Sequence, residues 1–89
     1  MMNLRSEHTT FEIIKVLIEN TLFDTIPSVA YQMGFNQASE PDLGFINVLG
    51  LTDFLVSEKM DEERIVGIVQ SYLEGYADGF EEYSIIIQN

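Results

Sequence analysis

Apolar and polar residues alternate along the chain at steps of three and four, which predicts helices and no β-strand of useful length. The first helix is expected from about Thr10 to Phe23. Thr9 and Glu12 form a capping-box pattern at its start, so residues 1–8 are predicted to be a loose N-terminus. The polar strip of this helix is narrow. The helix is therefore expected to lie at the centre of the core or to be buried against another chain.

A short second helix is predicted from Pro27 to Met33, because proline suits a first helical turn and Gly34 suits a helix end. Residues 35–38 are then expected to form a loop. This reading places only a few apolar side chains in the core from this part of the chain.

A third helix is predicted to end near Ser57 and to begin at a second capping pattern, formed by Ser39 and Asp42 around Pro41. An interior glycine costs a helix about 1 kcal/mol relative to alanine. A break at Gly50 therefore remains an alternative to one continuous helix.

The clearest element is a helix from Met60 to Tyr83, with acidic residues at its start and a broad apolar face. Residues 84–89 form a tail of uncertain structure, either a short strand or a segment lying across the core. The fold class is therefore predicted to be all-α. We expect a small bundle of three to five helices in a single domain over residues 1–89, with or without a short extended C-terminal tail.

Charge narrows the range of functions. Fifteen acidic residues face four basic ones, for a net charge of -11 among 89 residues. Such a surface repels nucleic acid and anionic membranes and attracts basic proteins, although charge can also serve solubility alone. There is no cysteine, no apolar run that could span a bilayer and no leader-like start. We therefore expect a cytoplasmic protein without direct contact to nucleic acid or membrane.

An acidic stripe is predicted on the polar side of the last helix. Glu74, Asp78 and Glu81 follow one another at steps of four and three, Glu63 lies in line with them, and Glu82 is nearby. Neighbours at these steps are separated by about 4.5–6 Å along the helix axis, a spacing within the range found between nucleic-acid phosphates. The stripe could therefore enter a basic groove of a partner. The alternative is an ordinary solvated helix face.

The same helix carries a line of small residues four apart: Gly67, Ser71, Gly75 and Gly79. Small residues allow a second backbone to approach closely. The line is expected to pack either against another helix of this chain or against a second chain, in which case the protein would be a homodimer.

Catalytic chemistry is not indicated. His8 is the only histidine, no serine has a candidate base, and no metal-binding or phosphate-binding pattern occurs. The stretch Asp42-Leu43-Gly44-Phe45 resembles the residues before the attachment serine of acyl and peptidyl carrier proteins, which are also acidic helical bundles. Asn47 stands where that family has its serine, and asparagine cannot hold a phosphopantetheine arm. We interpret the likeness as chance, or as a relative without the prosthetic group, and expect no cofactor.

Two functions follow from these features. The first is a non-enzymatic inhibitor or adaptor that covers a basic, nucleic-acid-binding surface of a partner protein, in the manner of phage or mobile-element inhibitors and of immunity proteins. The second is a homo-oligomeric structural or regulatory module that uses the apolar first helix and the small-residue line.

Overall fold

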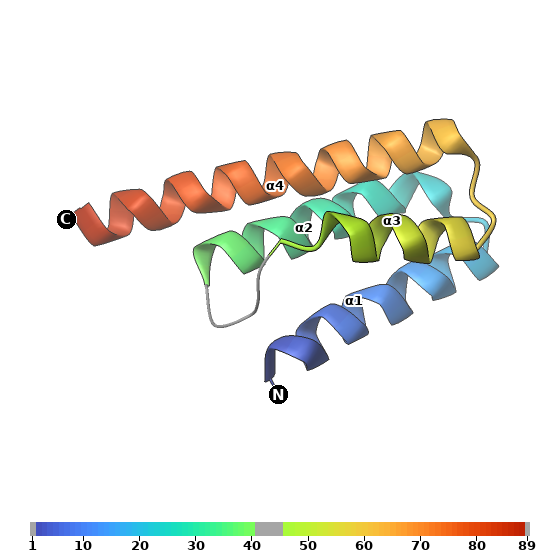
Figure 1. Cartoon of the computed structure of the whole chain (residues 1–89), viewed down its shortest axis with the longest axis horizontal. Coiled ribbons are helices and arrows are strands. Elements are labelled where there is room, and N and C mark those ends of the chain that lie inside the picture. The colour runs from blue at the N-terminus through green and yellow to red at the C-terminus, as the bar shows by residue number, and fades with distance from the viewer. Residues whose placement is uncertain (1, 41–45, 89) are drawn as a thin grey trace.

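A computed structural model of the chain describes residues 2–40 and 46–88, and these residues form an all-α bundle without strands, as the sequence predicts. The elements are α1 (Met2–Glu19), a single 3-10 turn η1 (Phe23–Thr25), α2 (Ile26–Ser39), α3 (Val48–Ser57) and α4 (Glu62–Gln88). Figure 1 shows α4 and α1 at opposite edges, with α2 and α3 between them. Successive helices run in opposite directions, so α2 and α4 are parallel.

Helix α1 is longer at its start and shorter at its end than the sequence pattern indicates. It begins at Met2, so residues 2–8 are helical and Thr9 lies inside the helix. No glycine or proline interrupts this stretch, and a cap favours a helix start by only about 1 kcal/mol. The helix ends at Glu19 in a Schellman motif, in which the Leu22 N–H donates to the Leu17 carbonyl at 2.8 Å. Thr21 occupies the left-handed position of this motif, with φ 56°.

Helix α2 continues through Gly34 to Ser39, so the predicted helix end at Gly34 and the predicted loop at residues 35–38 are wrong. A Cβ atom at Gly34 would lie 2.9 Å from the Tyr76 backbone nitrogen and closer still to the Tyr72 carbonyl oxygen. The glycine is therefore required for close packing against α4 rather than for ending a helix.

Helix α3 begins later than predicted and does not break at Gly50. Asn47 is its N-cap, because the Asn47 side-chain oxygen accepts a hydrogen bond from the Gly50 N–H at 2.9 Å. Ser39 belongs to the end of α2, while Pro41 and Asp42 of the predicted capping pattern lie outside the described residues. The end of α3 at Ser57 agrees with the prediction.

Helix α4 begins at Glu62 and extends to Gln88. Asp61 precedes it, and its carboxylate accepts a hydrogen bond from the Arg64 N–H at 3.3 Å. Residues 84–88 are helical, so the strand and the extended tail considered for them are wrong. The chain from Phe80 to Gln88 contains no glycine or proline that would end the helix.

The core draws on all four helices, and its fully or almost fully buried side chains are Ile14, Ile26, Ala30, Met33, Leu51, Leu55, Ile68 and Tyr72. Burying one large aliphatic side chain contributes roughly 1.5–3 kcal/mol before conformational entropy is subtracted. Phe11 of α1 stacks on Phe54 of α3 with ring centroids 4.9 Å apart. Among the described helices, none is both long and apolar enough to cross a membrane.

Candidate functional site on the faces of α4

The inner face of α4 packs against α2 along the most extensive helix–helix contact of the bundle. Gly75 and Gly79 are buried there. A Cβ atom at Gly75 would lie 2.9 Å from the Tyr31 Cα and closer still to the Tyr31 carbonyl oxygen, and Gly79 stands in the same relation to Phe35. Helix α2 of the same chain thus occupies the small-residue line at these two positions, and no room is left there for a second chain.

The other end of the small-residue line is different. Ser71 is half-buried, and a Cβ atom at Gly67 would meet no atom within 4 Å. The four residues that the sequence places on one line are therefore divided between a closed contact and an open surface.

A buried hydrogen-bond chain fixes α4 to the ends of α2 and α3. The Tyr72 hydroxyl, which is fully buried, donates to the Gln37 side-chain oxygen at 2.5 Å and accepts from the Asn47 N–H at 2.8 Å. Gln37 is 4% exposed. Because buried polar groups without partners are costly, this chain ties the position of α4 to the start of α3.

The acidic face of α4 is formed by the five predicted carboxylates, and all of them are exposed: Glu63, Glu74, Asp78, Glu81 and Glu82. The distance from Glu63 to Glu81 along the axis is about 27 Å at 1.5 Å per residue. The only basic side chain on α4, Arg64, pairs with Asp61 at 3.2 Å. Among the side chains that the structure describes, those of residues 10–40 and 46–83, none pairs as a cation with any of the five carboxylates. The face therefore keeps its negative charge.

Asp78 has one internal contact. Its carboxylate accepts a hydrogen bond from the Tyr31 hydroxyl of α2 at 2.5 Å. This hydrogen bond and the neighbouring charges of Asp78 and Glu74 raise the pKa of Tyr31 above its usual value of 10.0, with partial desolvation contributing to the same shift. Asp78 therefore lies at the edge of the acidic face that borders α2.

A third face of α4 is apolar and open. Val66, Leu73 and Phe80 are 50%, 42% and 57% exposed. We call these three residues the apolar row. They recur every seven residues, which is close to two helical turns, so they lie in one line along the helix.

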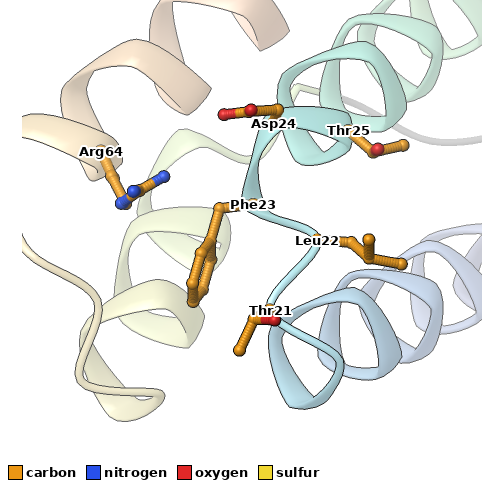
Figure 2. A pocket seen from close by; sticks show the side chains of 6 residues that line it. All are labelled: Thr21, Leu22, Phe23, Asp24, Thr25 and Arg64. Atoms are coloured by element: carbon orange, nitrogen blue, oxygen red, sulfur yellow. The ribbon is translucent and has the colours of Figure 1, made fainter.

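A shallow hollow of about 250 Å³ lies where the α1–α2 junction meets the start of α4. Figure 2 shows Arg64 approaching Phe23 and Asp24 from the opposite side of the hollow, while Leu22 and Thr25 point away from Arg64. The Arg64 guanidinium stands over the Phe23 ring at 4.5 Å from its centroid. This cation–π contact joins η1 to α4, so the position of the Arg64 side chain is explained by packing within the chain and does not indicate a ligand site.

The described residues contain no group of three acidic, histidine or cysteine side chains that could hold a metal ion. The stretch Asp42-Leu43-Gly44-Phe45, which resembles carrier proteins, lies outside the described residues. Asn47, at the position of their attachment serine, is the N-cap of α3. No protein-family model, curated protein or solved structure matches the chain.

The residues that sequence reasoning missed are Gln37, Asn47 and the apolar row. Asn47 had a readable signal, because asparagine before an apolar run is a common helix start. The seven-residue recurrence of the apolar row was also visible. Gln37 carries no signal, since only the packing of α2 against α4 buries it.

Proposed function

We propose that this chain is a non-enzymatic binding protein that uses the acidic face of α4 to cover a basic surface of a partner protein, as an inhibitor or adaptor. The observation that carries the proposal is the row of exposed carboxylates without ion pairs among the described residues. Close contact of Gly75 and Gly79 with α2 holds the backbone of that row in place, so only its side chains need ordering when a partner binds.

A matched pair of variants tests the proposal. Glu74→Gln/Glu81→Gln removes two charges from the acidic face, while Glu19→Gln/Asp53→Asn removes two exposed charges from α1 and α3. Both variants have the same net charge. Each is immobilised beside the unmodified chain, and basic proteins are captured from a cell extract at low salt. The first variant should lose bound partners, and the second should keep them.

Salt supplies the second measurement. Affinity for a captured partner should fall steeply between about 0.05 and 0.5 M salt, because screening shortens the range of exposed charges. Equal capture by both variants, or affinity that does not change with salt, would contradict occlusion by the acidic face.

The alternative function, a homo-oligomeric module, is favoured by α1 rather than by the small-residue line. Ile13 and Val16 are 45% and 54% exposed on α1. They line a shallow hollow of about 310 Å³ together with Glu12 and Leu17. A dimer by light scattering that Ile13→Gln/Val16→Gln converts to a monomer would support this function.

A further inference from the structure

The surface of α4 that the bundle leaves open is divided into three parallel bands. The first is the apolar row of Val66, Leu73 and Phe80. A second band of exposed, uncharged residues, Gln70 and Ala77, lies next to it. These two follow Val66 and Leu73 by four residues, which places them about 40° further round the helix.

The third band is the outer part of the acidic face. Glu74 and Glu81 follow Leu73 and Phe80 by one residue each, so they lie about 100° from the apolar row. Both are exposed. Because the bands run side by side along the same part of α4, one elongated partner can contact all three.

We propose that the occupant of this surface is a basic amphipathic helix of a partner protein, lying along Gln70 and Ala77. This inference rests on the proposed function and names its partner class. The helix places apolar side chains on the apolar row and lysine or arginine side chains beside Glu74 and Glu81. A seven-residue step is the repeat with which two helices interdigitate, so the partner carries apolar residues at heptad spacing over about four turns.

Charge distinguishes this occupant from a second copy of the chain. Two antiparallel copies packed through the apolar row would bring Glu74 and Glu81 of both chains to the same side of the contact. In either orientation each chain carries a net charge of -11, so the two copies repel one another. The one basic side chain on α4, Arg64, is paired with Asp61. A cationic helix instead neutralises the band and buries the apolar row in the same step.

The probe is a fluorescent peptide of about 18 residues that can form an amphipathic helix, with leucines at heptad spacing, lysines along one side of the leucines, and alanine and glutamine elsewhere. A control peptide has the same composition in scrambled order. Binding of both to the full chain is measured by fluorescence anisotropy at low and at near-physiological salt. The variants are Leu73→Gln/Phe80→Gln on the apolar row and, as the control, Leu49→Gln/Val56→Gln on α3. All four positions are exposed, and circular dichroism checks that the helices persist.

At near-physiological salt, the amphipathic peptide should bind the unmodified chain and the α3 variant alike. The apolar-row variant should bind it about tenfold or more weakly, as expected when two apolar contacts of that size are lost. The scrambled peptide should bind only at low salt.

Other outcomes separate the two proposals. Equal binding of both peptides, unaffected by Leu73→Gln/Phe80→Gln, would overturn the amphipathic partner and leave an acidic binding surface. If neither peptide binds even at low salt, both proposals fail. A dimer of the unmodified chain that only the apolar-row variant abolishes would assign the surface to a second copy.

Discussion

The two ends of the small-residue line on α4 are equivalent in sequence and different in structure. At one end, Gly75 and Gly79 lie against the α2 backbone, where a Cβ atom would collide. At the other end, Gly67 has open space around it. Small residues at four-residue steps therefore indicate a close helix contact only where a second helix is present, and the spacing alone cannot say how far the contact extends.

The largest effect is expected at the closed end. Gly75→Ala places a methyl group against the Tyr31 carbonyl, so α2 and α4 must move apart and the core must repack. Overpacking costs roughly 1–3 kcal/mol in free energy of unfolding, and contact with backbone rather than a flexible side chain places Gly75→Ala at or above the upper end of that range. Urea denaturation measures the loss. A larger residue such as leucine would disturb the bundle itself rather than split an oligomer. A loss below about 0.5 kcal/mol would show that the contact is not tight.

Tyr72→Phe tests the hydrogen-bond chain on the same closed side. The variant keeps the ring but leaves the Gln37 oxygen and the Asn47 N–H without the hydroxyl. We expect a loss of about 1–3 kcal/mol in urea denaturation. Tyr76→Phe is the matched control, because Tyr76 is only half-buried and should change stability little. Equal losses for the two variants would argue against a structural role for the chain of bonds.

Gly67→Ala should stabilise the protein, whereas Gly75→Ala should destabilise it. Open space receives the methyl group, and alanine is favoured over glycine inside a helix by about 1 kcal/mol, so thermal unfolding should shift upward. A lower unfolding temperature would mean that Gly67 is packed as closely as Gly75, so the two ends of the small-residue line would not differ.

The smallest effect on stability is expected for Tyr31, which lies where the contact between α2 and α4 borders the acidic face. Its pKa is raised in the folded chain, so folding favours the neutral hydroxyl. This contribution to stability is complete below the usual pKa of 10.0 and is lost as pH rises through the folded pKa. In an ultraviolet titration, Asp78→Asn should move one tyrosine to lower pH. No change would mean that the Tyr31–Asp78 hydrogen bond does not form in solution.

Helices and fold class could be predicted because periodicity reports which side chains face the core. Their boundaries could not be predicted in the same way. Gly34 was read as a helix end because the sequence does not show that α4 lies against it. Conversely, the left-handed position after α1 is Thr21 rather than glycine, so the end of that helix carries no glycine signal in the sequence.

For the candidate site too, the sequence could predict which residues share a face but not how the helices pack. The acidic face could be predicted as a set of residues, and the structure places all five on the surface. The sequence could not predict which small residues of α4 pack against another helix of the same chain, because that depends on the parallel placement of α2 beside α4. Comparison with carrier proteins identifies Asn47 only as a residue in place of the attachment serine, whereas its role as a helix cap follows from its hydrogen bond with the Gly50 N–H.

The parallel pairing of α2 with α4 also has a consequence for how the chain folds. Tyr31 and Gly75 are 44 positions apart (75 − 31), so the most extensive contact is formed across a long intervening segment. Adjacent antiparallel helices could meet early, but closing this segment has an entropic cost that local contacts do not offset. During synthesis, α2 would emerge well before the residues it packs against. Folding should therefore be slower than for bundles of this size built from neighbouring hairpins, and it should reach completion only once α4 has emerged.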